Sequence, residues 1–144
     1  GAPIRSFTRI SDIPIDIHCQ ITSPDVVVIV DPTVIGVVNV TEGLKESGTI
    51  IVNTPQTPAA MRSKLDLTSG KVFTVDASRI SLDTLGRPMP NTPMLGALVK
   101  ATGLVSLEGL VGFTKSRLGA KFRAQVVEAN VKSIERAYNE VVEG

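Results

Sequence analysis

Three short apolar runs, each bounded by polar or turn residues, dominate the first half of the chain. They are VVVIV at 26–30, TIIVN at 49–53 and KVFTV at 71–75. Continuous apolar runs of this length are typical of strands buried on both faces of a sheet, and parallel strands need crossover connections. The intervals 33–47 and 57–65 are predicted to be crossover helices. The middle of the chain is therefore predicted to form a βαβαβ unit.

The segment before these runs has the alternating pattern of a half-buried strand. In IPIDIHCQI at 13–21, the odd-numbered residues, Cys19 among them, are apolar, whereas the even-numbered residues, His18 among them, fall on the opposite face. IRSFTRI at 4–10 precedes this stretch, and Ser11 and Asp12 between the two supply turn chemistry. The pattern predicts an antiparallel N-terminal hairpin, with Cys19 as a small core residue and His18 facing solvent.

The second half of the chain is predicted to be helical. Helices are expected at 76–85, 93–102, 106–118 and 122–142, with the Pro-rich connector GRPMPNTP at 86–93. The last helix carries an apolar stripe at spacings of four and three residues, which indicates that it covers the sheet or contacts another subunit. The stripe consists of Val127, Val131, Ile134, Tyr138 and Val141.

Length and composition fit this pattern. A chain of 144 residues with 42% hydrophobic but only 3% aromatic residues must build its core from Val, Ile, Leu and Ala, which suits buried parallel strands. We predict an α/β fold of three layers, with a mostly parallel sheet, an antiparallel N-terminal hairpin and C-terminal helices. Residues 1–144 are expected to form a single domain.

Charge argues against nucleic-acid binding. Fifteen Lys and Arg against fourteen Asp and Glu give a net charge of +1, whereas a nucleic-acid binder is expected to have a strongly basic face. The tightest basic cluster, KSRLGAKFR, contains Lys115, Arg117, Lys121 and Arg123. Either a solvated junction between helices or a docking site for an acidic partner surface would account for it.

Cysteine and histidine are too few for several kinds of site. His18 and Cys19 are neighbours, and neighbours in a strand point to opposite faces, so they cannot form a thiolate–imidazole pair. One His and one Cys cannot supply the protein ligands that zinc takes. The lone Cys, together with the lack of a signal-like segment or a long apolar run, makes a reducing, cytoplasmic setting the expectation.

Polar residues follow each predicted parallel strand, where ligands bind in open α/β sheets. The three strand ends read Asp31-Pro32-Thr33, Asn53-Thr54-Pro55 and Asp76-Ala77-Ser78. They are interpreted either as helix caps and turns or as the floor of a crevice that faces a ligand or a partner subunit. Neither G-x-G-x-x-G nor G-x-x-x-x-G-K-[ST] occurs in the sequence, and no nucleophile with a base is visible. The residues favour a binding or assembly module without its own catalytic group.

The stretch NTPMLGALVKATG at 91–103 is predicted to be a capped helix. Asn91 or Thr92 is expected to cap free N–H groups, and Pro93 to occupy the first helical position. Small residues, Gly96 and Ala97 among them, would permit close packing. Intrachain packing, a subunit contact and direct ligand contact all remain open at this point.

Several segments together resemble a known family. GAPIRSFTRISD, SPDVVVIVDPTVI, EGLKESGTIIVNT, KVFTVDASRI and above all GRPMPNTPMLGALVKATGLVSLE resemble the gamma subunit of the 2-oxoacid:ferredoxin oxidoreductases, the pyruvate synthase family. The resemblance runs from residue 1 to about residue 138. It implies a gamma subunit that assembles with alpha, beta and delta subunits in an enzyme of anaerobic metabolism.

The resemblance also implies the chemistry of that complex. Family members decarboxylate a 2-oxoacid on thiamine diphosphate with Mg²⁺, and pyruvate is the 2-oxoacid expected here. They transfer the acyl group to coenzyme A and pass electrons through 4Fe-4S clusters to ferredoxin. The gamma subunit is expected to hold none of these cofactors alone, but to lie beside the thiamine site and to help bind coenzyme A. A free-standing nucleotide or acyl-CoA binding module is the alternative.

The residues that match the family at helix and strand ends are candidate cofactor contacts. Asn91, Thr92 and Pro93 match the start of a helix, and Asn53 and Thr54 match a strand end. Family members carry an upstream strand and a segment resembling G-R-G-G-Q-G, which are not in this sequence. The first βα unit of the family fold is therefore expected to be missing from these 144 residues.

Overall fold

The computed structural model describes residues 2–144 and contains a four-stranded sheet in the order β1-β2-β3-β4. Strands β1, β2 and β3 are parallel and confirm the three predicted strands; β4 pairs antiparallel with β3 and was not predicted. The strands are β1 (Val26–Ile29), β2 (Thr49–Asn53), β3 (Lys71–Val75) and β4 (Val142–Glu143).

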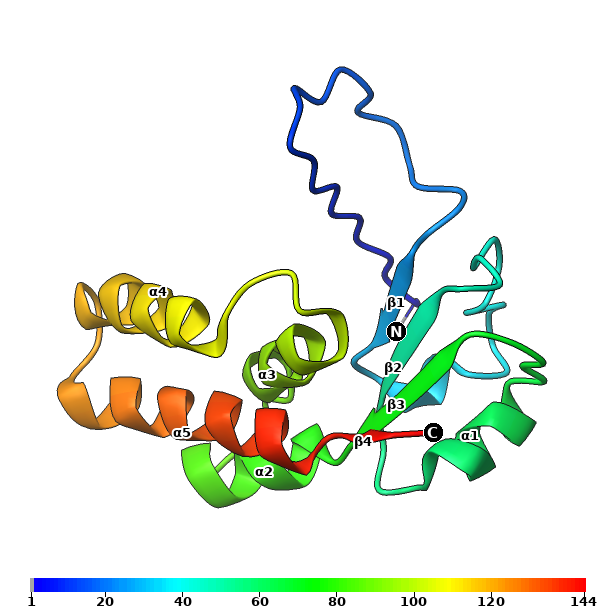
Figure 1. Cartoon of the computed structure of the whole chain (residues 1–144). Helices are drawn as coiled ribbons and strands as arrows, with labels where there is room; N and C mark the ends of the chain where they lie inside the picture. The colour runs from blue at the N-terminus through cyan, green and yellow to red at the C-terminus, as the bar shows by residue number, and fades with distance from the viewer. Residues whose placement is uncertain (1) are drawn as a thin grey trace.

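Within residues 2–144, five α-helices accompany the sheet and confirm every predicted helix except the first (Figure 1). They are α1 (Pro58–Lys64), α2 (Ala77–Leu85), α3 (Asn91–Thr102), α4 (Leu107–Gly119) and α5 (Ala124–Glu140). The prediction of a crossover helix at 33–47 was wrong, because only the short 3-10 helix η1 (Pro32–Val34) forms there. The segment is rich in β-branched residues and turns at Gly36 and Gly43, whose φ angles are 90° and 72°. Both features disfavour a helix.

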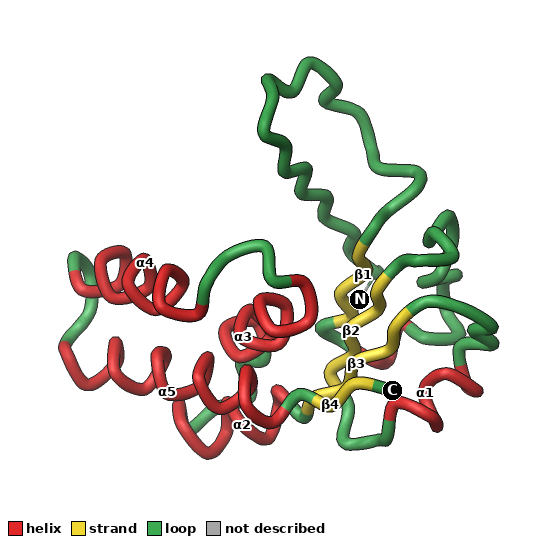
Figure 2. Tube along the Cα trace, viewed as in Figure 1, coloured by secondary structure: helices red, strands yellow, loops and turns green. Residues whose placement is uncertain are grey.

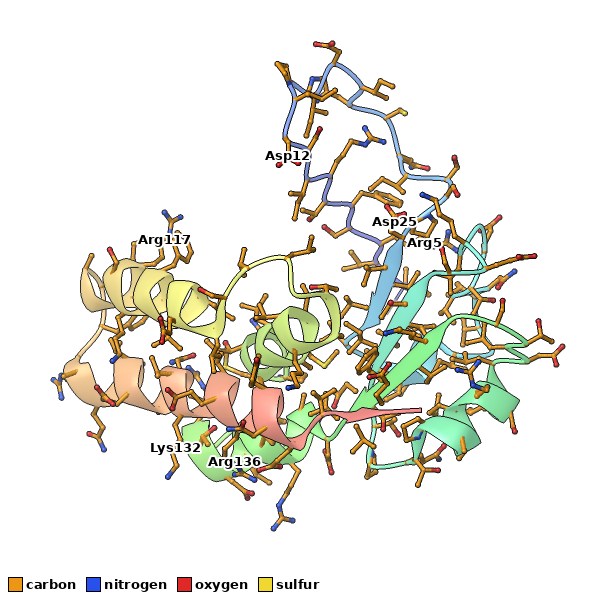
Figure 3. All side chains as sticks on the ribbon, viewed as in Figure 1. Arg5, Asp12, Asp25, Arg117, Lys132 and Arg136 are labelled. Atoms are coloured by element: carbon orange, nitrogen blue, oxygen red, sulfur yellow. The ribbon has the colours of Figure 1, made fainter. Side chains whose placement is uncertain are left out.

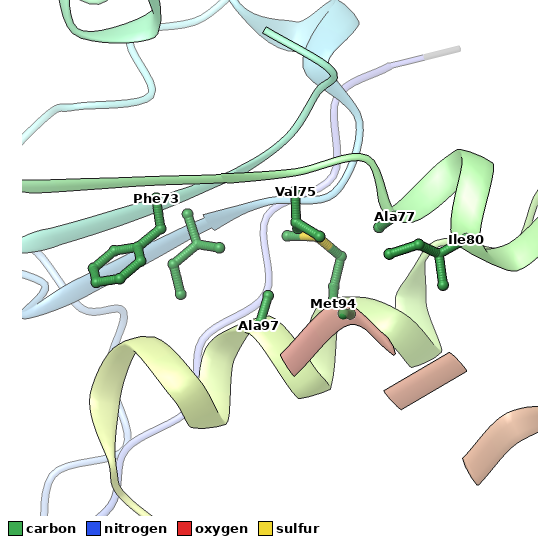
Figure 4. Packing of buried hydrophobic residues seen from close by; sticks show 8 residues of the cluster. Phe73, Val75, Ala77, Ile80, Met94 and Ala97 are labelled. Carbon is green, nitrogen blue, oxygen red and sulfur yellow. The ribbon is translucent and has the colours of Figure 1, made fainter. Parts of the chain in front are cut away.

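The sheet is buried on both faces, which confirms the three-layer prediction. Successive residues of a strand point to opposite faces. Ile51 of β2 therefore joins Phe73 and Val75 in a core that faces α2, α3 and α5, as Figure 4 shows for part of this cluster. Ile50 and Val52 point the other way and pack with residues of α1 and of the loop that contains η1.

Helices α3 and α5 lie in backbone contact. A Cβ atom at Gly96 would stand 2.1 Å from the carbonyl oxygen of Ile134, so only glycine allows this separation. Ile134 and Ala137 of α5 are fully buried, and Ala97 of α3 faces the sheet core. Of the three explanations for the small residues of α3, intrachain packing is the one that the structure realises at Gly96. The apolar stripe of α5 packs mainly on α3, α2 and α4.

The N-terminal hairpin prediction was wrong. Residues 2–25, which we call the N-terminal arm, contain no strand and form a loop that extends away from the sheet and returns to β1 (Figure 2). Cys19 is exposed rather than buried. An alternating segment becomes a strand only where a neighbouring strand accepts its backbone hydrogen bonds and an apolar layer covers its face. The described residues of this chain provide neither beside the arm.

Candidate functional site

Asn53, at the end of β2, links three parts of the fold through its buried side chain. Its Nδ2 donates to the carbonyl oxygen of Val30 at 2.8 Å and to Ser78 Oγ at 2.9 Å. Its Oδ1 accepts from the backbone N–H of Ser78 at 3.1 Å. Both amide hydrogens are therefore used within the chain. The residue fixes the end of β1 and the start of α2 against the end of β2.

Thr54 and the two aspartates at the other strand ends also bond locally. Thr54 is buried, and its Oγ1 accepts from the backbone N–H of Gln56 at 3.2 Å. Asp76 Oδ1 caps α2 by accepting from the backbone N–H of Arg79 at 3.0 Å. These bonds are those of caps and turns. Contact of Asn53 or Thr54 with a ligand stays a prediction.

Asp31, at the end of β1, forms an exposed turn with Thr33. Its Oδ1 accepts from the Thr33 hydroxyl at 2.7 Å and from the Thr33 backbone N–H at 2.9 Å. These hydrogen bonds, the one from the hydroxyl first, favour the charged carboxylate and lower the pKa of Asp31. The same two bonds place Asp31 as the N-cap residue that organises the start of η1.

The start of α3 differs from the prediction. Pro90 occupies the N-cap position with helical φ and ψ of −70° and −13°, and no side chain caps the helix. The prediction that Asn91 or Thr92 caps the helix was wrong, and Pro93 is the third residue of the helix rather than the first. Because Pro90 already has helical angles, the turn begins before either polar side chain reaches a capping position. The N–H groups of Asn91 and Thr92 have no intrahelical acceptor at these positions.

Exposure distinguishes the members of this helix start. Asn91 is exposed, Thr92 is half-buried, and Pro93 is buried. Met94 packs in the sheet core with Val75, the last residue of β3 (Figure 4). Val75 is the register partner of Asn53, so this packing places the start of α3 near the carboxyl ends of β2 and β3. The structure thus brings the two groups of predicted residues to the same end of the sheet.

The sequence analysis missed a serine pair that holds this region together. Ser81 is completely buried in α2; its hydroxyl donates to the carbonyl oxygen of Ser78 at 2.8 Å and accepts from the N–H of Met89 at 3.0 Å. The second bond ties the Pro-rich connector before α3 to α2. A serine on the apolar face of a helix, one residue after Ile80, was the available signal.

Residues 2–144 contain neither a metal-binding cluster nor a membrane-spanning helix. No group of three or more His, Cys, Asp or Glu side chains in this range is placed to hold a metal ion. None of the helices within it combines the length and the apolar character needed to cross a bilayer.

Comparisons with known proteins agree on one family for nearly the whole chain. Residues 1–140 match the family model described as pyruvate ferredoxin/flavodoxin oxidoreductase. A curated relative named pyruvate/ketoisovalerate oxidoreductases common subunit gamma, from Thermococcus kodakarensis, is 45% identical over 142 residues, which cover 99% of this chain and 75% of the relative. The pyruvate synthase subunit PorC of Thermotoga maritima is 42% identical over 141 residues, which cover 98% of this chain and 72% of that protein.

A solved structure has the same fold. The crystal structure of pyruvate oxidoreductase subunit PORC from Thermotoga maritima matches with a TM-score of 0.77 and 38% sequence identity. The match covers 86% of this chain and 67% of the crystallised one.

Proposed function

Because the chain belongs to the pyruvate ferredoxin/flavodoxin oxidoreductase family and is of its gamma-subunit type, we propose that it works in a multisubunit enzyme with alpha, beta and delta subunits. This enzyme oxidatively decarboxylates a 2-oxoacid, pyruvate first among the candidates, with coenzyme A. The products are acyl-CoA and CO₂, and the electrons released reduce ferredoxin. The observation that carries the proposal is the 45% identity to a common gamma subunit over 99% of this chain.

In this proposal the thiamine diphosphate, Mg²⁺ and iron–sulfur clusters belong to the other subunits. A 4Fe-4S cluster is usually held by four cysteine thiolates, and this sequence has one cysteine. The donor set of the chain therefore does not fit a cluster of its own. The role assigned to this chain is assembly beside the thiamine site and contact with coenzyme A.

The N-terminal arm is the proposed assembly surface. Large apolar side chains along it face solvent, and exposed apolar surface of this extent marks contacts with other proteins. Arg5, labelled in Figure 3, ties the base of the arm to the body through an ion pair with Glu42 at 3.3 Å. The exposed fractions are 92% for Ile4, 43% for Phe7, 70% for Ile10, 73% for Ile13 and 63% for Ile17.

The start of α3 is the proposed contact with coenzyme A. The exposed Asn91 and the half-buried Thr92 present two backbone N–H groups without intrahelical acceptors at the positive end of a 12-residue helix, where phosphate groups bind favourably. Asn53 and Thr54 are only 4% and 8% exposed, so their proposed contribution to this contact is its buried floor.

The assembly proposal is tested by anaerobic purification of the tagged gene product from its native host. We expect thiamine-bearing and iron–sulfur-bearing chains to co-purify, and the complex to reduce viologen with one of pyruvate, 2-oxoglutarate and 2-oxoisovalerate. Recovery of this chain alone, together with tight binding of coenzyme A, NAD or FAD in calorimetry, would instead favour a free-standing binding module.

The coenzyme A proposal is tested in the same complex with Asn91→Ala/Thr92→Ala. We expect a higher apparent KM for coenzyme A and an unchanged KM for the 2-oxoacid. The matched control, Asn139→Ala/Thr68→Ala, removes an exposed amide and an exposed hydroxyl elsewhere and should change neither. An unchanged KM for coenzyme A in the first variant, with normal assembly, would refute a contact through the Asn91 and Thr92 side chains.

A further inference from the structure

Helix α4 has two faces, only one of which is covered by other residues of the described range 2–144. Its half-buried side chains, Leu107, Leu110, Val111 and Leu118, share a face with Thr114, the one buried residue of the helix, and α4 packs on α5 and the end of α3. The opposite side and the turn into α5 line an open hollow of about 350 Å³. The lining residues, at the spacing of one helical stripe, are Phe113, Ser116, Arg117, Ala120 and Lys121.

The hollow is built from small residues between a large apolar one and two cations. Ser116 and Ala120 contribute small side chains to its lining, and Phe113 contributes an aromatic ring that is 64% exposed. Phe122, 52% exposed, lies just beyond in the sequence. An exposed aromatic ring beside a hollow is a typical anchor of protein interfaces, in which aromatic residues and Arg are enriched.

Charge around the hollow is positive and not neutralised within residues 2–144. Lys115, Arg117, Lys121 and Arg123 are exposed, no acidic residue occurs between Glu108 and Glu128, and none of the ion pairs in this part of the chain involves these four cations. We call this group, with Phe113 and Phe122, the α4–α5 corner. Figure 3 shows Arg117 on α4, far from the sheet.

The helix dipoles of this chain favour the position of one of these cations but not of another. Arg117 lies in the last turn of α4, where the helix dipole favours a cation. Arg123, however, is the N-cap residue of α5, at the positive end of a helix whose first turn contains no acidic residue. A cation at that end is locally unfavourable. Its presence is explained if an anionic group outside this chain compensates it.

We propose that the α4–α5 corner docks an acidic protein segment that inserts one apolar side chain beside Phe113 while its carboxylates pair with Arg117, Lys121 and Arg123. The exposed rings and the modest net charge of +1 favour a protein over nucleic acid, whose binders have more extensive basic faces. The positive charge of the corner requires a negatively charged partner, and the hollow beside Phe113 requires that this partner carry an apolar side chain.

The test uses the 144-residue chain attached at low density to a sensor surface through its N-terminus, so that self-association does not intervene. The probe is a helical peptide with Leu on one face and Glu on the other. One control peptide has the same residues in scrambled order, and a second control peptide has Lys in place of Glu. We expect the Glu peptide to bind best, and its affinity to fall about tenfold when NaCl rises from about 50 to about 300 mM.

Two variants separate charge from the apolar anchor. Arg117→Glu/Lys121→Glu should abolish binding, and Phe113→Ala should weaken it about tenfold, without change in the circular dichroism spectrum. The matched control, Lys64→Glu/Arg87→Glu, makes the same change in net charge at exposed positions elsewhere and should bind normally.

Three results would overturn the proposal. The first is equal binding of the ordered and scrambled peptides together with no effect of Phe113→Ala, which would show unspecific charge attraction. The second is tighter binding of oligouridylate, or competition by inorganic phosphate at millimolar concentration, which would assign the corner to phosphate groups. The third is no binding of the Glu peptide at low salt.

Discussion

Replacement of Gly96 by alanine tests the packing of α3 on α5. The new Cβ would stand 2.1 Å from Ile134 O, 3.0 Å from Ile134 C and 3.1 Å from Tyr138 N. All three are backbone atoms of one helix, so no side chain can rotate away and α3 and α5 must separate. Overpacking of this kind costs about 1–3 kcal/mol, and the backbone clash places it at the upper end.

Helix propensity offsets part of this cost. Alanine inside a helix is favoured over glycine by about 0.8–1 kcal/mol, so the net expectation for Gly96→Ala is a loss of about 2 kcal/mol in the free energy of unfolding. Urea unfolding followed by circular dichroism measures it; with a slope of about 2 kcal/mol per M, the midpoint should fall by about 1 M.

Gly112→Ala is the matched control. Gly112 also lies inside a helix, α4, but a Cβ there meets nothing within 4 Å. This variant should be stabilised by up to about 1 kcal/mol. If Gly96→Ala proved as stable as Gly112→Ala, the close contact between α3 and α5 would be wrong.

Three further predictions follow from the strand ends and the N-terminal arm. Asn53→Ala leaves buried hydrogen-bonding groups without partners and should lower the free energy of unfolding by about 2–4 kcal/mol, whereas no change in a urea titration would contradict the bonds described. The pKa of Asp31 is lowered in the folded chain, so its contribution to stability is present above the pKa of a free aspartate and is lost as pH falls through the folded pKa. NMR titration should show this lowered pKa, with a return toward the ordinary value in Thr33→Ala. The exposed apolar side chains of the arm should make the isolated chain self-associate, and Ile13→Ser/Ile17→Ser should reduce this self-association in gel filtration with little change in unfolding. Loss of folding would show that the arm belongs to the core.

The sequence predicted those elements whose residues carry their own pattern. The apolar runs at 26–30, 49–53 and 71–75 and the stripe of α5 needed no knowledge of their neighbours. Strand β4 has two residues, too few for a periodicity, and its position depends on β3. The interval 33–47 was predicted from its length alone, although its own residues favour turns.

The N-terminal arm shows a different limit. The alternation at 13–21 indicates a face that needs covering, but it does not say whether the cover comes from this chain or from another. The structure shows Ile13 and Ile17 without such a cover. The alternating pattern and the exposed position of the arm are consistent with each other if another subunit covers the apolar face of residues 13–21.

The candidate site was predicted in its residue types more than in its contacts. Asn53 was identified as a strand-end residue, yet its bonds reach Ser78, 25 residues away, and depend on the register of β2 against β3. The predicted capping of α3 by Asn91 or Thr92 was wrong because Pro90 already has helical angles and the helix begins earlier than the sequence pattern indicates.

The most direct test of the central claim is expression of the partner subunits with and without this chain in one anaerobic host. We measure viologen reduction that depends on both 2-oxoacid and coenzyme A. The account predicts activity only when the chain is present, and its restoration when the chain is expressed from a second plasmid. Equal activity without the chain would contradict its assignment as a working subunit of the oxidoreductase.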